Sequence, residues 1–263
     1  MITFSHLGQL GRMGNQMFQY ATLYSVAMAK NYDFGVPFDK KSNNEYFNFC
    51  LNECFSHLSA RSCKNTNVNY YKEKDFCFDS SIFDIPNNTD LYGYFQSEKY
   101  FIKYKQDILR EFTFNEEIIK ISKNIKSQFN NPTVSVHIRL GDYLNPINKT
   151  MHPIPDIKYY QNSMDIMPKD LKYIIFSDDI FLAKNILKSI DKNFIYIDTK
   201  NKYVDMCLMT LCDYHIIANS TFSWWGAWLA DSKLVIAPKK WFGESPNAPK
   251  KWSDIYCNGW ITL

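Results

Sequence analysis

Two short polar stretches carry residue types that could hold a phosphate group. Arg139 follows the β-branched run 133–138, and its guanidinium offers a rigid fork of donors that matches phosphate oxygens. Ser220 and Thr221 follow the apolar run 215–218 and open a segment with helical periodicity. The N–H groups at such a helix start, with nearby hydroxyls, favour an anion. Together the two stretches could hold a diphosphate and stabilise its charge as it leaves. Each alone is equally typical of a capped turn.

Acidic residues stand beside these stretches. Asp178 and Asp179 end the predicted strand 172–177, and one of the two could accept hydrogen bonds from the N1–H and N2–H₂ edge of a guanine. Asp142 is placed to pair with Arg139, a pairing compatible with phosphate binding. The chain contains no Asp-x-Asp pair and no HExxH motif, so the sequence predicts no metal site.

The elements that position these residues follow an alternating pattern. Strands are predicted at 133–138, 172–177, 194–197, 215–218 and 233–237, and helices at 157–167, 180–189, 203–212 and from about 221. Such alternation predicts a parallel, Rossmann-like sheet, in which ligands gather at the carboxyl ends of the strands. That edge would bring together His137, Arg139, Asp142, Asp178, Asp179, Ser220 and Thr221.

The amino-terminal part is predicted to begin with a strand at 2–7, a glycine-rich turn at 8–16 and a helix to about Lys30. A glycine-rich turn lets the backbone approach a ligand closely. This one matches neither the GxGxxG dinucleotide fingerprint nor a P-loop. A Cys-, Asn- and Tyr-rich stretch at 43–81 indicates an irregular insertion. Asn130-Asn131-Pro132 marks the predicted boundary between domains 1–130 and 131–263, with the C-terminal tail returning to the first domain.

Composition excludes several classes of protein. With 46% hydrophobic and 22% charged residues the chain is an ordinary globular α/β candidate, and a net charge of +3 gives no reason to expect nucleic acid as a partner. Seven cysteines without CxxC spacing suggest neither a zinc site nor a disulfide framework. The sequence begins without a signal-peptide pattern and lacks an apolar run of about 18–20 residues. We therefore expect a cytoplasmic location. The patch Lys239-Lys240-Trp241-Phe242 is either a peripheral membrane contact or a solvated turn.

Four motifs in this order carry a family resemblance. They are 11–21 (GRMGNQMFQYA), 136–143 (VHIRLGDY), 176–179 (FSDD) and 218–226 (ANSTFSWWG). The chain resembles the bacterial α-1,2-fucosyltransferases of glycosyltransferase family 11. That resemblance implies a GT-B-like fold of two facing Rossmann-like domains, with the acceptor side N-terminal and the donor side C-terminal. It also implies inverting transfer of L-fucose from GDP-β-L-fucose, without a metal or other cofactor, to the 2-hydroxyl of a galactoside in surface polysaccharide or O-antigen synthesis.

The resemblance also implies roles for residues on the donor side. The family's His-x-Arg motif falls on His137 and Arg139, whose arginine is expected on the β-phosphate of GDP. Asp142 is the carboxylate of the same motif and is expected to act in catalysis, at least by orienting Arg139. The remaining donor-side residues are expected to be Ser220, Thr221 and Phe222 near the diphosphate, and Asp178 or Asp179 near the guanine.

On the other side, the family's Gly-Asn-Gln turn falls on Gly14, Asn15 and Gln16 and is expected near fucose and the acceptor. Asn15 would position the acceptor, and the base that takes its proton is not identified. The acceptor would be a galactose-terminated glycan or a lipid-linked oligosaccharide.

Two positions depart from the family pattern. Leu140 stands where many relatives carry a second arginine, and Arg12 stands where bacterial relatives often carry Gly or Leu. Two other functions therefore stay open. One is a different GDP-sugar transferase of related fold, such as a protein O-fucosyltransferase. The other is a catalytically silent protein that binds a nucleotide sugar.

Overall fold

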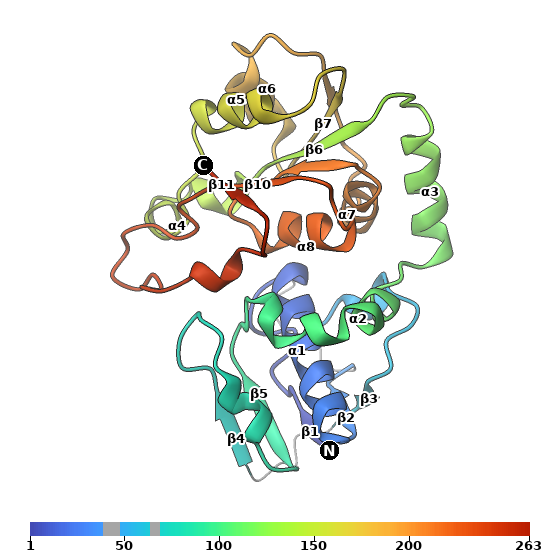
Figure 1. Cartoon of the computed structure of the whole chain (residues 1–263), viewed down its shortest axis with the longest axis vertical. Coiled ribbons are helices and arrows are strands. Elements are labelled where there is room, and N and C mark those ends of the chain that lie inside the picture. Colours follow the sequence, from blue (N-terminus) through green and yellow to red (C-terminus); the bar gives the residue numbers. More distant parts are fainter. Residues whose placement is uncertain (39–47, 64–68) are drawn as a thin grey trace. The chain divides into compact units, whose positions relative to one another are not determined.

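The computed structural model describes residues 1–38, 48–63 and 69–263, which fold into two compact units (Figure 1). Unit 1 comprises 1–115 and 251–257, and unit 2 comprises 116–250 and 258–263. The insertion predicted at 43–81 lies partly outside the described residues.

Unit 2 is built on a six-stranded parallel sheet. Its strands are β6 (Thr133–Ile138), β7 (Lys172–Ser177), β8 (Phe194–Tyr196), β9 (Tyr214–Ile216), β10 (Val235–Ala237) and β11 (Ile261–Thr262). The order is β11-β10-β9-β6-β7-β8. From β6 the chain proceeds outward to β8, and from β9 it proceeds outward on the other side to β11. The strand order therefore reverses between β6 and β9, and this switch point is where such sheets bind ligands.

Helices cover both faces of this sheet. They are α3 (Glu116–Lys126), α4 (Pro146–Met151), α5 (Ile157–Ile166), α6 (Ile180–Leu187), α7 (Lys202–Thr210) and α8 (Thr221–Leu229). Helices α5 and α6 lie on one face, and α3, α7 and α8 lie on the other (Figure 1). Side chains of a strand alternate between faces, so Ile175 packs with α5 and α6 while Ile174 and Phe176 pack with Leu208 of α7. The predicted α/β class is confirmed.

Helix α8 differs from the prediction in its pattern of burial. The helical periodicity of the sequence, with Phe222, Trp225 or Gly226, and Leu229 on one side, predicts a single apolar face, but every residue of 223–228 is buried. A helix that is buried on all sides shows no apolar stripe, so the periodicity was misleading. Gly226 permits this packing, because a Cβ there would lie 2.9 Å from the Cβ of Met209 on α7.

Unit 1 contains a five-stranded parallel sheet in the order β3-β2-β1-β5-β4. Its elements are β1 (Ile2–Thr3), α1 (Met13–Lys30), β2 (Phe34–Val36), β3 (Arg61–Ser62), β4 (Asn69–Lys72), β5 (Thr89–Tyr92) and α2 (Lys105–Glu111). From β1 the chain proceeds outward to β3, crosses to the other edge at β4 and returns inward to β5. Helix α1 starts earlier than predicted, so Gly14, Asn15 and Gln16 occupy its first turn and Arg12 is its N-cap residue.

The division into units differs from the predicted one at 130/131. Helix α3 belongs to unit 2, where Ser122 Oγ donates to the carbonyl of Val204 on α7 at 3.2 Å. The segment 251–257 belongs to unit 1, where Asp254 accepts hydrogen bonds from Lys99 Nζ at 2.6 Å and from the N–H of Phe78 at 2.9 Å.

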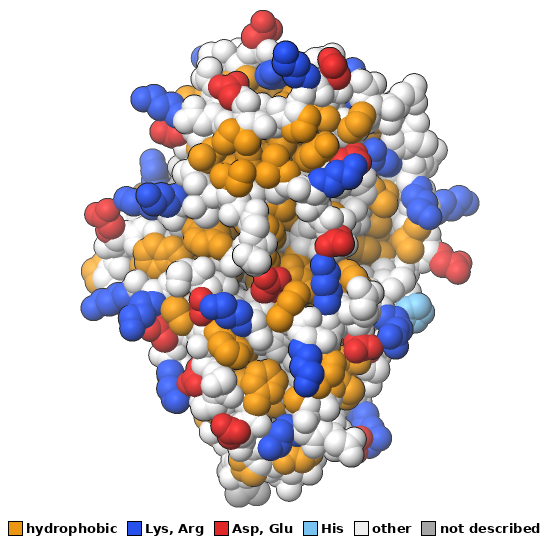
Figure 2. Space-filling view, in the orientation of Figure 1, with side chains coloured by type: hydrophobic (Ala, Val, Ile, Leu, Met, Phe, Trp, Pro, Cys, Tyr) orange, Lys and Arg blue, Asp and Glu red, His pale blue; other side chains and the backbone are white. Residues whose placement is uncertain are grey.

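Surface features bear on the remaining expectations. Trp241 and Phe242 are buried while Lys239 and Lys240 are exposed, so the aromatic half of that patch is unavailable to a membrane. On the face shown in Figure 2, basic and acidic side chains are interspersed. None of the described helices is both long and apolar enough to cross a bilayer. All seven cysteines are free thiols.

Candidate active site

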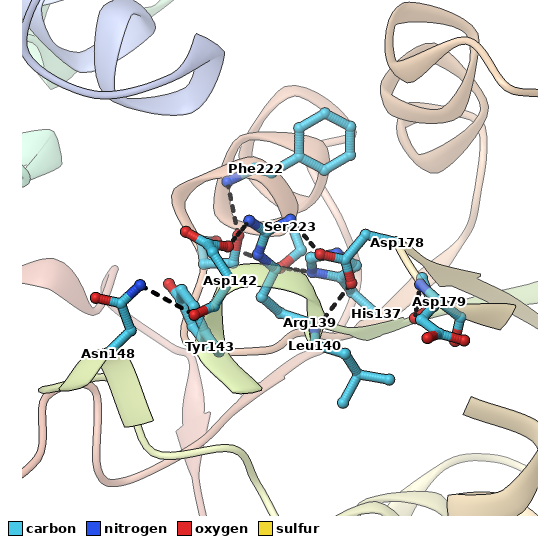
Figure 3. A network of polar contacts seen from close by, with 12 residues as sticks. His137, Arg139, Leu140, Asp142, Tyr143, Asn148, Asp178, Asp179, Phe222 and Ser223 are labelled. Carbon is cyan, nitrogen blue, oxygen red and sulfur yellow. Dashed lines mark hydrogen bonds and ion pairs between the residues drawn. The ribbon is translucent and has the colours of Figure 1, made fainter. Parts of the chain in front are cut away.

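Arg139, the first residue after β6, lies between two carboxylates (Figure 3). One terminal nitrogen, Nη1, is 2.6 Å from Asp178 Oδ2, and Nη2 donates to Asp142 Oδ1. The predicted pairing with Asp142 is confirmed, and Asp178 adds a second partner from the end of β7. With 16% of its side chain exposed, Arg139 is mostly buried but reaches solvent.

The backbone after Arg139 shapes this arrangement. The N–H of Leu140 donates to Asp178 Oδ1 at 2.8 Å, which fixes the carboxylate. Gly141 has φ +26°, and a Cβ there would lie 2.2 Å from Asp178 Oδ2. A glycine is therefore required for Asp178 to reach the guanidinium. The Leu140 side chain packs in the core beside α5 and α6, so this position presents no charge to the site.

Tyr143 supports the same guanidinium from the side. The Arg139 Cζ lies 5.3 Å from the centre of the Tyr143 ring, within range of a cation–π contact. That ring also stacks on His152, with centroids 4.6 Å apart, and its hydroxyl donates to the carbonyl of Asn219 at 3.1 Å. Tyr143 thus connects the loops that follow β6 and β9. Sequence reasoning quoted Tyr143 within a motif but gave it no role, and it missed His152, which has no motif around it.

His137 is a buried neighbour of the site. Its Nδ1 is 2.8 Å from Ser223 Oγ on α8, and its ring lies near that of Phe222. Burial, reinforced by the nearby Arg139 charge, lowers the pKa of His137 to about 3. The imidazole is therefore neutral near pH 7 and can offer a hydrogen bond but no positive charge.

The start of α8 lies beside Arg139 because β9 and β6 are neighbours. Ser220 is the N-cap residue, and its Oγ accepts from the N–H of Phe222 at 3.4 Å. Thr221 and Phe222 are half-buried in the first turn. The predicted gathering at this edge is therefore found for His137, Arg139, Asp142, Asp178, Ser220 and Thr221, and Phe222 lies beside them in the first turn of α8.

Asp179 has a separate position from Asp178. Its carboxylate accepts from the N–H of Leu182 at 2.9 Å and caps α6. The sequence left open which of the two acidic residues would face a nucleobase. In the structure Asp178 is committed to Arg139 and Asp179 to a helix cap, so the guanine contact stays a prediction for both.

In unit 1, the Gly-Asn-Gln residues are held by local contacts. Gln96 Nε2 donates to Asn15 Oδ1 at 3.0 Å. Gln16 is buried, and its amide bonds to the carbonyl of Asn48 at 2.8 Å and to the N–H of Cys50 at 3.0 Å. Gly14 is buried in the same turn. Gln16 therefore holds the backbone of residues 48–50 in place. The position near fucose and the acceptor that was predicted for Gly14, Asn15 and Gln16 remains a prediction.

The chemistry available in unit 2 is anion binding at a switch point. A guanidinium with two exchangeable carboxylate partners and an adjacent helix N-terminus suits a diphosphate. Within the described ranges, no three His, Cys, Asp or Glu side chains are grouped to hold a metal ion. Independence from metal stays a prediction.

Comparisons with known proteins agree with this geometry. The family model "Glycosyl transferase family 11" matches residues 5–263, and the chain belongs to that family of glycosyltransferases. An α-1,2-colitosyltransferase of Escherichia coli is 31% identical, over 93% of this chain and 96% of its own length. The O-antigen biosynthesis glycosyltransferase WbnK of Escherichia coli is 28% identical over 96% and 98%. The galactoside α-(1,2)-fucosyltransferase 2 of Pongo pygmaeus is 26% identical over 91% and 73%.

Solved structures confirm the GT-B-like fold. The α-1,6-fucosyltransferase NodZ, soaked with GDP-fucose, matches with a TM-score of 0.59 at 12% identity, over 91% of this chain and 95% of that one. POFUT1 in complex with GDP-fucose matches with a TM-score of 0.53 at 13% identity, over 100% and 97%. At these identities the likeness concerns the fold alone.

Proposed function

We propose that the protein transfers L-fucose from GDP-β-L-fucose to the 2-hydroxyl of a galactoside, with inversion, during synthesis of a surface polysaccharide such as an O-antigen. Membership of family 11 supports transfer of a sugar. The names of the relatives support the finer parts of the proposal. The galactoside α-1,2-fucosyltransferase and the α-1,2-colitosyltransferase support the donor class and the linkage. The O-antigen glycosyltransferase supports the pathway.

The observation that carries the proposal is Arg139 at the switch point of unit 2, held between Asp142 and Asp178. Oxygens of a β-phosphate would compete with these carboxylates for the guanidinium. As the bond from the anomeric carbon to the diphosphate breaks, negative charge grows on the leaving oxygen, so the contact with Arg139 strengthens in the transition state. Tyr143 keeps the guanidinium in place from the side.

The remaining partners follow from the chemistry of the reaction. Displacement at an anomeric carbon passes through a state with oxocarbenium character, so stabilising the departing GDP carries most of the catalysis. The first turn of α8 would assist on the diphosphate. The acceptor is a galactose-terminated glycan or lipid-linked oligosaccharide, with the protein at the cytoplasmic face of the membrane when the acceptor is lipid-linked.

A second candidate differs in the donor sugar. The colitosyltransferase is 31% identical to this chain, and colitose is L-fucose without its 3-hydroxyl. GDP-colitose is therefore the competing donor. Discrimination would require a group that hydrogen-bonds the 3-hydroxyl, because a site with such a group strongly rejects the deoxy sugar.

The test is release of GDP by the purified protein, with GDP-fucose or GDP-colitose as donor, a panel of β-galactosides as acceptors, and EDTA present. Arg139→Ala is compared with Arg110→Ala, because Arg110 also pairs with an aspartate three residues away but is exposed and lies in unit 1. We expect acceptor-dependent release that survives EDTA, falls by about 10²–10³-fold in Arg139→Ala and is unchanged in Arg110→Ala.

Other outcomes assign the protein differently. If GDP is released faster with GDP-colitose than with GDP-fucose, the donor sugar is colitose. Tight GDP binding without release for any acceptor favours a silent nucleotide-sugar binder. Absence of GDP binding rejects the proposal.

A further inference from the structure

His137 has one ring nitrogen that the contacts of unit 2 leave unused. It is the last but one residue of β6, two residues before Arg139, and its imidazole points toward α8 (Figure 3). Nδ1 lies 2.8 Å from Ser223 Oγ, and the Phe222 ring lies 5.9 Å from the imidazole between centroids. Nε2 has no hydrogen-bond partner among the residues that the structure describes, although His137 is only 5% exposed.

This nitrogen is accessible from the ligand-binding edge of the sheet. In the described part of unit 2, the side-chain polar atoms that are sealed from solvent without a partner are His152 Nδ1, His215 Nδ1 and Asn219 Oδ1. Nε2 of His137 is not one of them, so it is unpartnered and yet reaches the surface. Side chains of a strand alternate between faces, so His137 and Arg139 lie on the same face of the sheet. A ligand held by Arg139 at this end of β6 can therefore reach Nε2.

The hydrogen bonds of Ser223 determine which nitrogen of the imidazole carries the hydrogen. Ser223 Oγ donates its one hydrogen to the carbonyl of Ser220 at 3.3 Å, one turn back along α8. That carbonyl also accepts from the N–H of Trp224 at 3.0 Å, and its oxygen has lone pairs for both. Ser223 Oγ is therefore the acceptor toward His137, and Nδ1 is the donor. Because burial lowers the pKa of His137 to about 3, the ring is neutral and Nε2 holds a lone pair.

A lone pair on Nε2 restricts the chemical group that can bind there. The oxygens of a diphosphate have no hydrogen to donate at neutral pH, so Nε2 would repel them. A sugar hydroxyl is a donor and complements the lone pair. In a sugar nucleotide one sugar stands at each end of the diphosphate, the ribose on one side and the transferred sugar on the other. When Arg139 holds the diphosphate, a hydroxyl of one of these two sugars is the group within reach.

We propose that His137 accepts a hydrogen bond from a sugar hydroxyl of the donor, on the ribose or on the transferred sugar, and that Ser223 is its positioning residue. This inference rests on the proposed function. Two residues of one strand then divide the donor between them. The guanidinium of Arg139 binds the charged diphosphate, and the neutral imidazole of His137 binds an uncharged hydroxyl beside it. Ser223 keeps the lone pair on the nitrogen that faces the ligand.

The experiment compares two replacements of His137 by isothermal titration near neutral pH. A glutamine places its amide oxygen near the position of Nε2, whereas an asparagine reaches Ser223 and leaves the position of Nε2 empty. The ligands are GDP, a dideoxy-GDP that lacks both ribose hydroxyls, and GDP-fucose. His215→Gln is the matched control, because His215 is a fully buried histidine of the same sheet whose Nε2 is 2.9 Å from the carbonyl of Met209.

The three ligands identify the group that His137 binds. We expect His137→Asn to bind GDP about three- to tenfold more weakly than the wild type and His137→Gln do, which is the contribution of one hydrogen bond. With dideoxy-GDP this difference should vanish. If the hydroxyl belongs to the transferred sugar, the loss should appear with GDP-fucose alone. Equal losses with all three ligands would place His137 on the diphosphate and overturn the inference, as would the absence of any loss. His215→Gln should bind all three as the wild type does.

Nitrogen NMR of the histidine rings tests the tautomer in the wild type itself. We expect a hydrogen on Nδ1 of His137 and none on Nε2. In Ser223→Ala we expect a mixture of the two tautomers and a smaller loss of affinity than in His137→Asn, a combination that a purely structural role of Ser223 would not produce. A wild-type His137 with its hydrogen on Nε2 overturns the inference alone. A wild type that binds neither GDP nor GDP-fucose overturns the proposed function as well.

Discussion

The carboxyl ends of two inner strands, β6 in unit 2 and β1 in unit 1, carry opposite charge patterns. At the edge of unit 2, the cation Arg139 lies between the carboxylates of Asp142 and Asp178. At the edge of unit 1, the carboxylate of Asp90 is surrounded by neutral hydroxyl and backbone donors. The first arrangement can exchange a carboxylate for a phosphate, because both are anions that a guanidinium binds. In the second, neutral donors already satisfy the carboxylate.

The difference shows that similar arrangements of strands and helices carry different side-chain chemistry in the two units. A leaving diphosphate needs a fixed positive charge, which Arg139, the first residue after β6, can supply. The helix and sheet supply position, and a few residues determine the chemistry.

The largest expected effect comes from breaking the unit 2 arrangement without changing a charged residue. Gly141→Ala would place a Cβ 2.2 Å from Asp178 Oδ2 and impose strain at φ +26°, displacing Asp178 from Arg139. We expect kcat to fall by about 10²-fold. Gly259→Ala is the control, since Gly259 also has a positive φ but has no atom within 4 Å of an added Cβ. Equal activity of the two variants would show that the Asp178 contact is dispensable.

A smaller effect is expected from Asp178→Asn, which distinguishes two roles for this carboxylate. The asparagine oxygen can still accept from the N–H of Leu140, while its amide group replaces the oxygen that binds Arg139. If Asp178 serves Arg139, kcat falls about tenfold and GDP binds more tightly, because a carboxylate near the phosphates is removed. If it contacts the guanine, GDP binds more weakly. Isothermal titration with GDP measures this, and Asp179→Asn provides the comparison at the adjacent cap.

The smallest expected effect is on the free energy of unfolding, which depends on pH in opposite directions in the two units. In unit 2, burial lowers the pKa of His137 to about 3 and that of His215 to about 4. Their stabilising contribution is present above the ordinary histidine pKa and is lost as pH falls from about 6.5 toward 4. In unit 1, burial raises the pKa of Glu73 to about 7, although the N–H groups of Tyr94 and Phe95 oppose this. Its contribution is lost as pH rises from about 4.5 to 7.

Amide hydrogen exchange, corrected for the intrinsic effect of pH, measures each unit separately. Protection of β6 and β9 should fall by the equivalent of about 1–3 kcal/mol on acidification. Protection of residues 93–96 should instead fall as pH rises. If protection changed in the same direction with pH in both units, the predicted opposite pH dependence would be wrong.

The sequence predicted most of unit 2 because its pattern is regular. Strands 133–138 and 172–177 were located to the residue, and the gathering of Arg139, Asp142 and Ser220 followed from the rule for parallel sheets. It could not predict that Asp178 rather than Asp179 turns to Arg139. Which aspartate contacts Arg139 depends on the backbone conformation at Gly141, and the spacing of apolar residues gives no information about that conformation.

Unit 1 was less predictable for a physical reason. Several of its strands are short, β1 and β3 having two residues each, so the alternation that signals a strand is nearly absent. The hydrogen bonds of Thr3 and Ser5 to Asp90 join residues far apart in the sequence, and they become visible once β1 and β5 are known to be neighbours. Tyr143 and His152 were overlooked because an aromatic stack leaves no signature in the spacing of residues.

The path of the chain between the units constrains how the protein is made. After unit 2 has received residues 116–250, the segment 251–257 completes unit 1 with Asp254, and 258–263 then supplies β11 to unit 2. Unit 1 has all its parts only after residue 257 has been translated, and unit 2 has its last strand only after residue 262. The nascent unit 1 must therefore wait, with Lys99 and the N–H of Phe78 lacking their aspartate, while more than half of the chain is still being synthesised.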